Sequence, residues 1–133
     1  RPLAFWKLLN KRQPIIDLAS SDATIQRGAY LVETLGHCGE CHTSRNFIGG
    51  LKYGYWLGGA KNPTGRGMIP SLTPAKFTWN TEEIVEYLAS GFTPDFDVAG
   101  GHMVDVIENT SNLTEQDRLA IAEYLKAIPG VQK

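Results

Sequence analysis

The chain has 133 residues, a formal net charge of −1 and 42% hydrophobic residues. This length fits one domain that buries about two thirds of the surface exposed by its unfolded chain, which is enough to enclose a cofactor. Thirteen Lys and Arg against fourteen Asp and Glu give no basic field for binding a nucleic acid. The apolar segments are too short, and too often interrupted by charges and prolines, to provide a transmembrane segment.

We expect residues 1–20 to form an N-terminal arm or linker and residues 21–133 to form the main domain. The arm contains several apolar residues without a sustained helical period, so we expect it to be extended, with about one helical turn. Phe5 and Trp6 are expected to pack on the domain, or alternatively to face another domain or a partner. Because the chain begins at Arg1 rather than Met, we expect that processing or truncation has removed a preceding region.

A first helix is expected over residues 22–35. Ser21 or Asp22 caps its start, apolar residues follow at helical spacing, and Gly36 ends it. Gly28 inside this helix costs about 1 kcal/mol relative to alanine, so it needs a structural reason. Close approach of another helix is the natural one.

A second helix is expected to begin at a capping box formed by Asn80 and Glu83 and to end at Gly91. Residues 103–108 are expected to form a short helix of one or two turns.

The last expected helix is capped by Thr114 and ends at Pro129. Its apolar stripe makes Tyr124 and Leu125 available to meet Gly28 of the first helix. The sequence therefore predicts an all-α domain without a substantial sheet, in which the first and last helices cross.

Residues 43–76 contain seven glycines and three prolines and are expected to form long irregular loops. A loop of this length in a compact domain is usually functional. Wrapping a flat cofactor is such a function, because a glycine-rich backbone can lie close to a ring. An apolar wall for the ring, or else ordinary core, would come from the nearby aromatic residues Phe47, Tyr53, Tyr55, Trp56 and Phe77.

The pentapeptide Cys38-Gly39-Glu40-Cys41-His42 has the C-x-x-C-H pattern of covalent haem attachment. Each thiol can form a thioether to one of two vinyl groups on a single porphyrin edge, while the adjacent imidazole reaches the iron. One short segment thus fixes the cofactor, its orientation and its proximal ligand. The pattern predicts one covalently attached haem c.

The pentapeptide has three alternative interpretations. A redox-active disulfide of the C-x-x-C kind requires a βαβ context. A structural zinc site requires four ligands, and the chain adds only His37 and His102 to these three. Two buried cysteines without a cofactor leave the adjacent histidine unexplained.

The sixth ligand of the iron decides its chemistry, because methionine gives an electron-transfer centre and an empty site lets oxygen species react. Met103 is favoured, since it follows the flexible Gly100-Gly101 pair and opens a helix some 60 residues after the motif. The alternatives are Met68, His102 or no ligand. An open site would make the protein a peroxidase-like enzyme or a ligand-binding haem protein.

Taken together, several short motifs resemble class I cytochromes c over residues 22–129. The sequence looks closest to haem domains of bacterial mono- and dihaem cytochromes c, including electron-accepting subunits of periplasmic flavin- or quinone-dependent dehydrogenases. The motifs are Arg27-Gly28-Ala29-Tyr30-Leu31, Cys38 to His42, Ile69-Pro70-Ser71-Leu72-Thr73-Pro74, Trp79 before a capped helix, Gly100-Gly101-His102-Met103, Asn109-Thr110, and Ala122-Glu123-Tyr124-Leu125.

This resemblance implies helices around one haem, with thioethers from Cys38 and Cys41, His42 as proximal ligand and Met103 as distal ligand. It places Gly28 and Tyr124 at the crossing of the terminal helices. The segment containing Ser71 would run along the haem edge. A haem propionate would be bound by Ser71, with Arg45, Trp56 and Trp79 as alternative donors.

The resemblance further implies a one-electron carrier rather than an enzyme, located in a bacterial periplasm. Its partners would be redox proteins, namely a dehydrogenase, another cytochrome, or a terminal oxidase or reductase. They would dock near the haem edge through a transient interface of less than about 1,200 Å². With balanced charge, strong electrostatic steering need not apply. The arm over residues 1–20 looks like the linker that follows a first haem domain in dihaem relatives.

Overall fold

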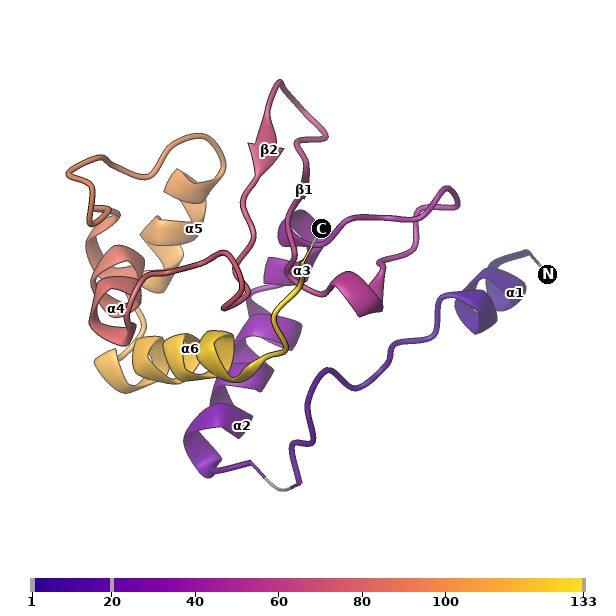
Figure 1. Cartoon of the computed structure of the whole chain (residues 1–133), viewed down its shortest axis with the longest axis horizontal. Coiled ribbons are helices and arrows are strands. Elements are labelled where there is room, and N and C mark those ends of the chain that lie inside the picture. The colour runs from indigo at the N-terminus through magenta and orange to yellow at the C-terminus, as the bar shows by residue number, and fades with distance from the viewer. Residues whose placement is uncertain (1, 20, 133) are drawn as a thin grey trace.

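The computed structural model describes residues 2–19 and 21–132 and is mainly helical (Figure 1). The one small sheet among these residues is antiparallel, with Ala60 opposite Ile69 and Lys61 opposite Met68. The predicted all-α class is therefore confirmed. The elements in chain order are α1 (Pro2–Leu9), α2 (Ala23–Tyr30), the π-helical turn η1 (Leu31–Leu35), α3 (Cys38–His42), the 3₁₀ turn η2 (Tyr53–Tyr55), β1 (Ala60–Lys61), β2 (Met68–Ile69), α4 (Thr81–Ser90), α5 (Met103–Thr110) and α6 (Glu115–Ala127).

Helices α2 and α6 cross in close contact, as predicted (Figure 1). A Cβ atom added to Gly28 would lie 2.0 Å from the carbonyl oxygen of Ala120 and 2.7 Å from Cβ of Tyr124. No side chain fits between the two backbones at this point. The crossing explains why glycine stands inside a helix despite its low helix propensity.

The first predicted helix has the expected extent but changes its geometry half-way. Asp22 caps it by accepting a hydrogen bond from the backbone N–H of Ile25, at 2.9 Å. From Leu31 onward the chain forms a π-helical turn, and the N–H of Gly36 donates to the carbonyl oxygen of Leu31 at 2.6 Å. Such wider turns are frequent at functional sites, and this one leads directly to the pentapeptide.

The predicted capping box of α4 is present. The side chain of Asn80 accepts from the N–H of Glu83, and the side chain of Glu83 accepts from the N–H of Asn80, both at 2.8 Å. Helix α4 ends at Gly91, whose φ of 80° is the left-handed conformation that glycine tolerates.

The last two helices also begin as expected. Thr114 caps α6 by accepting from the N–H of Asp117 at 3.1 Å. Helix α5 begins at Met103 and continues two residues beyond the expected end, to Thr110. The hydroxyl of Thr110 donates to the carbonyl oxygen of Leu88 at 2.7 Å, which fastens the end of α5 to α4.

The prediction of an extended arm was wrong for residues 2–9, which form the eight-residue helix α1. Pro2 is its first residue, a position where the fixed φ of proline favours helix initiation. Phe5 is 63% exposed, so the expected packing through both aromatics fails for Phe5. Trp6 does contact the body, because its indole N–H donates to the carbonyl oxygen of Ile48 at 2.7 Å. The division at residue 20 stays a prediction, and residues 1 and 20 lie outside the described residues.

The core lies between α2, α4 and α6, together with the segment that carries Trp56 and Leu57. Tyr124, Leu57 and Val32 are its largest fully buried apolar side chains. Within residues 2–19 and 21–132, no helix combines the length and the apolar character that a membrane crossing requires.

Candidate functional site

The pentapeptide forms the single-turn helix α3, which directly follows His37 in the left-handed conformation at φ 49°. Residues three and four apart lie on the same face of a helix. Cys38, Cys41 and His42 therefore share one face. Both cysteines are free thiols, and burial raises the pKa of the Cys38 thiol to about 11, which keeps it neutral at pH 7. The arrangement presents two thiols and one imidazole to the same side.

The imidazole of His42 is fixed by a hydrogen bond to the backbone. His42 is 7% exposed, and its Nδ1 lies 2.8 Å from the carbonyl oxygen of Pro70. Because a carbonyl only accepts, Nδ1 carries the proton and Nε2 keeps its lone pair. Burial lowers the pKa of His42, which favours the neutral imidazole. Among the described residues no hydrogen bond occupies Nε2, so this buried histidine has the tautomer that a metal ligand needs.

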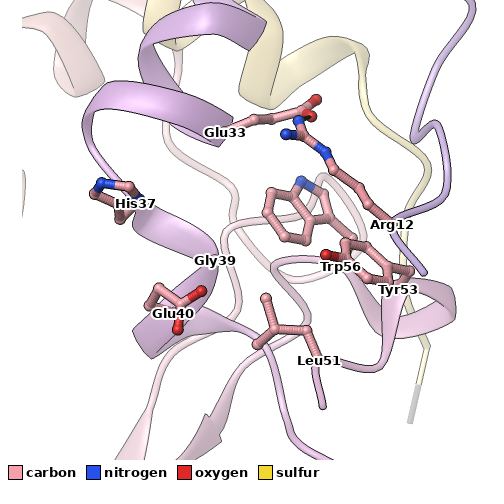
Figure 2. A pocket seen from close by; sticks show the side chains of 8 residues that line it. All are labelled: Arg12, Glu33, His37, Gly39, Glu40, Leu51, Tyr53 and Trp56. Carbon is pink, nitrogen blue, oxygen red and sulfur yellow. Dashed lines mark hydrogen bonds and ion pairs between the residues drawn. The ribbon is translucent and has the colours of Figure 1, made fainter. Parts of the chain in front are cut away.

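Helix α3 packs against the Trp56 ring at Gly39 (Figure 2). A Cβ atom on Gly39 would lie 2.2 Å from the Trp56 ring, so only glycine fits here. The indole N–H of Trp56 donates to the hydroxyl of Tyr124 at 3.1 Å, and that hydroxyl donates to Glu33 at 2.5 Å. Arg12 pairs with the same Glu33 carboxylate. This chain of contacts ties α3 to α6, to η1 and to the N-terminal arm.

The contacts made by Arg12 and Glu33 were not predicted from the sequence. Their signal was weak: Glu33 is a charged residue within the turn η1, where it lies next to the buried Val32. A cavity of about 180 Å³ opens beside these residues (Figure 2). It is lined by Arg12, Glu33, His37, Gly39, Glu40, Leu51, Tyr53 and Trp56, and thus by neither cysteine nor His42.

Three of the four predicted propionate donors, Arg45, Trp56 and Ser71, already have hydrogen-bond partners. Arg45 donates to the carbonyl oxygen of Gly49 at 2.8 Å and pairs with Glu40. Trp56 donates to Tyr124, as described above. Their roles toward a propionate stay predictions.

The other two predicted donors, Ser71 and Trp79, contact other parts of the chain. The Ser71 hydroxyl donates to the carbonyl oxygen of Leu57 at 3.4 Å and lies 3.1 Å from Thr73 Oγ1. Trp79 packs against Phe77 and Tyr87, with ring centroids 5.1 Å and 5.0 Å apart. Within residues 2–19 and 21–132, no hydrogen bond joins any two of these four donors.

The expected aromatic wall is divided between core and surface. Trp56 is buried and stacks on Tyr53, with ring centroids 5.9 Å apart. Phe77 packs on the core, Tyr55 is exposed, and Phe47 is 99% exposed. Phe47 therefore contributes nothing to the core.

The candidate sixth ligands differ in their surroundings. Met103 is the first residue of α5 and is half-buried against the core. Met68 lies on β2 and is 65% exposed. His102 has its Nε2 at 2.9 Å from the hydroxyl of Thr64.

The described structure bears on two of the other interpretations of the cysteines. The described strands form one two-stranded antiparallel sheet, not the βαβ unit of disulfide oxidoreductases. Within the described ranges, no group of three or more His, Cys, Asp or Glu is placed to hold a metal ion by itself.

Comparison with known proteins decides the family, although no family model matches the chain. A protein named dihaem cytochrome c-type from Cereibacter sphaeroides is 54% identical over 133 residues, covering 98% of this chain and 44% of the relative. The chain is a cytochrome c-type haem domain. The same relationship extends to the cytochrome c subunit of alcohol dehydrogenase (quinone) from Gluconobacter oxydans, at 38% identity over 144 residues, covering 98% of this chain and 30% of the relative.

The cytochrome subunit of fructose dehydrogenase from Gluconobacter japonicus is 33% identical over 136 residues, covering 96% of this chain and 27% of the relative. The cytochrome c domain described here thus spans less than half the length of each of these relatives. The predicted resemblance to class I cytochromes c related to dehydrogenase subunits is confirmed.

Proposed function

We propose that this cytochrome c domain is a one-electron carrier whose haem c is attached to Cys38 and Cys41 and ligated by His42 and Met103. The observation that carries the proposal is the buried His42, whose Nδ1–H donates to Pro70 and whose Nε2 is left for iron. The two cysteines on the same face of α3 supply the thioether positions. The donor set fits a c-type haem, which supplies a reversible one-electron couple when bound.

The protein's own residues hold the site rigid rather than perform chemistry. The hydrogen bond from His42 to Pro70 fixes the ring orientation and raises its basicity as a ligand. Trp56 supports the back of α3. A thioether sulfur from Met103, half-buried at the start of α5, would favour a raised reduction potential of the haem and would exclude other ligands from the iron.

The names of the relatives support a role next to a dehydrogenase. Two of them are cytochrome subunits of alcohol and fructose dehydrogenases. We therefore propose that the domain accepts electrons from a dehydrogenase and passes them to another cytochrome or a terminal oxidase or reductase. Haem c is attached outside the bacterial cytoplasm, so the proposed location is the periplasm.

Covalent attachment is tested by intact mass. The wild-type chain is expected to carry the mass of one haem, and the variant Cys38→Ala with Cys41→Ala is expected to lose it. Retention of the haem mass in the double variant would refute attachment at these residues. A metal assay for zinc on the same samples distinguishes haem from a zinc site.

The sixth ligand is tested with the two methionines as matched variants. Met103→Ala is expected to abolish the ferric absorption band at the red end of the spectrum and to lower the reduction potential. Met68→Ala, which removes an exposed thioether, is expected to leave both unchanged. The reverse outcome would make Met68 the ligand. An unmodified protein that binds exogenous ligands and turns over peroxide would instead support the open-site alternative.

A further inference from the structure

The segment over residues 91–99, here called the Phe96 loop, joins α4 to α5 and projects from the edge of the molecule (Figure 1). It is closed by backbone hydrogen bonds: Thr93 N–H donates to the Asp97 oxygen at 2.9 Å, and Ala99 N–H donates to the Gly91 oxygen at 2.8 Å. Phe96 at its tip is fully exposed and has a φ of 61°. A bulky residue held in this conformation is strained, which is common at functional positions.

A groove of about 330 Å³ lies beside this loop, between the end of α4 and α5. Val98, Ala99, Val104 and Ile107 supply apolar walls, and the carboxylate-bearing Glu108 also lines it. Long basic side chains bury their aliphatic stems along apolar surface while the charged head stays in a polar environment. The groove therefore suits the stem of a lysine or arginine whose head meets Glu108.

Although the net charge is only −1, acidic and basic residues are distributed very unevenly along the chain. Residues 77–117 contain nine Asp and Glu and neither Lys nor Arg, whereas residues 1–76 contain ten Lys and Arg and four Asp and Glu. Asp95, Asp97, Asp105 and Glu108 are exposed on the Phe96 loop and α5, around Phe96 and the groove. The expectation that electrostatic steering need not apply, which came from the balanced total, overlooked this local field.

We propose that the Phe96 loop and α5 form the docking surface for a redox protein with lysines or arginines around an apolar centre. Phe96 would enter an apolar hollow on that partner, and one basic side chain of the partner would enter the groove. An exposed aromatic with an acidic rim provides the central anchor and the polar surround of a typical interface. The proposal rests on the electron-carrier function proposed above.

The position of the surface agrees with that function. Helix α5, which supplies one wall of the groove, begins at Met103, the proposed distal ligand. A partner seated here would lie next to the iron ligand, which shortens the path of the electron. Two copies joined face to face through this surface would bring like charges together, which disfavours a symmetric dimer.

Binding is tested on the holoprotein, with a strongly basic c-type cytochrome as the probe. Amide NMR shifts upon addition of the probe are expected at residues 91–108. The variant Asp95→Asn/Asp105→Asn/Glu108→Gln is expected to weaken binding about tenfold at low ionic strength, an effect that salt removes. The matched control Glu82→Gln/Glu86→Gln/Glu115→Gln removes the same charge outside the surface and is expected to change affinity less than about twofold.

Phe96→Ala tests the apolar anchor and is expected to weaken binding about tenfold with an unchanged visible spectrum. An altered spectrum would place Phe96 against the haem and overturn its docking role. The docking surface would be overturned if the matched control weakened binding as much as the triple variant at Asp95, Asp105 and Glu108. It would also be overturned if the amide NMR shifts were confined to residues outside 91–108, or if they appeared on raising the protein concentration without the probe. Failure of the carrier function is separate, because it would appear as a wild type that a small-molecule reductant cannot reversibly reduce, whether or not the probe binds.

Discussion

Gly39 and Phe96 are both held in short segments, but by different means. Gly39 lies in α3 with its backbone against Trp56, and Trp56 in turn is hydrogen-bonded to Tyr124 of α6. Phe96 touches nothing outside its own loop, which is closed by local backbone hydrogen bonds. The attachment side of the domain, defined as α2, η1, α3, α6 and Trp56, thus depends on contacts between distant residues. The distal side, residues 91–110, depends more on local ones.

The difference between long-range and local contacts suits the two sides to different roles. A rigid attachment side keeps His42, the proposed proximal ligand, in one orientation, which would limit rearrangement during the proposed electron transfer. A distal side with an exposed loop is free to contact partners. If this comparison is right, substitutions on the attachment side lower the stability of the whole domain, whereas substitutions at the loop tip change binding and leave stability nearly unchanged or higher.

The largest expected effect comes from Gly28→Ala. The added Cβ would lie 2.0 Å from a backbone oxygen of Ala120, so α2 and α6 must separate. Overpacking of this kind is expected to lower the free energy of unfolding by about 2–3 kcal/mol, although alanine has the better helix propensity. Denaturant unfolding of the holoprotein measures it.

Gly54→Ala is the matched control, because a Cβ there meets nothing within 4 Å. Its expected effect is within about 0.5 kcal/mol. Equal effects of the two substitutions would show that the helix crossing is not the tight contact described here.

Tyr124→Phe is expected to cost about 1–2 kcal/mol. It removes one hydroxyl but leaves the buried indole N–H of Trp56 without its acceptor, and it leaves Glu33 with Arg12 as its remaining partner. Burial and the Glu33 carboxylate raise the pKa of Tyr124 above its ordinary value. The unfolded chain therefore releases this proton first, and stability falls as pH rises above about 10.

In Tyr124→Phe, the part of the stability loss at alkaline pH that comes from the Tyr124 hydroxyl should be absent. Unfolding midpoints of wild type and variant, measured at pH 8 to 11, test this. A decrease of the same size in wild type and variant would mean that Tyr124 does not contribute to it. Because Phe keeps the ring, packing changes little, and the comparison isolates the hydroxyl.

The sequence predicted the starts of α2, α4, α5 and α6, and the motifs that indicated the cytochrome c family, because these signals are local. Asn80, Thr114 and Gly91 act on their own helix ends, and Gly28 was explained by a crossing helix. The support of α3 could not be predicted in the same way. It needs the indole of Trp56 and the carboxylate of Glu33 to meet through Tyr124, which lies 68 and 91 residues from them in sequence.

The helical form of residues 2–9 and the exposure of Phe5 were missed for another reason. The arm has apolar residues on all sides, so periodicity gave no helical signal, although its residues favour helix. The uneven distribution of charged residues can be read from the sequence, but the net charge of −1 does not show it. The propionate donors and the sixth ligand stay predictions.

Phe96→Gly is expected to raise the free energy of unfolding by about 0.5–1 kcal/mol. Glycine adopts the left-handed conformation at φ 61° without the penalty that a side chain carries, and the exposed ring makes no packing contact that would be lost. Unfolding midpoints of wild type and variant measure this. A decrease in stability would mean that the Phe96 ring packs on the domain, and the contrast between the two sides would then be wrong.

The smallest expected effect comes from Asp117→Asn at the crossing of α2 and α6. Two hydrogen bonds of 2.8 and 2.9 Å join Arg27 to Asp117 across these helices, and they lower the pKa of the Asp117 carboxyl. The unfolded chain takes up this proton first as the pH falls, so the pair stabilises the domain above the ordinary pKa of aspartate, about 3.9, and loses this contribution below it. Wild type and variant should therefore differ slightly at pH 7 and converge near pH 2 in urea unfolding. A difference that persists at low pH would instead reflect the shape of the side chain, because asparagine keeps an oxygen for Arg27 but removes the charge.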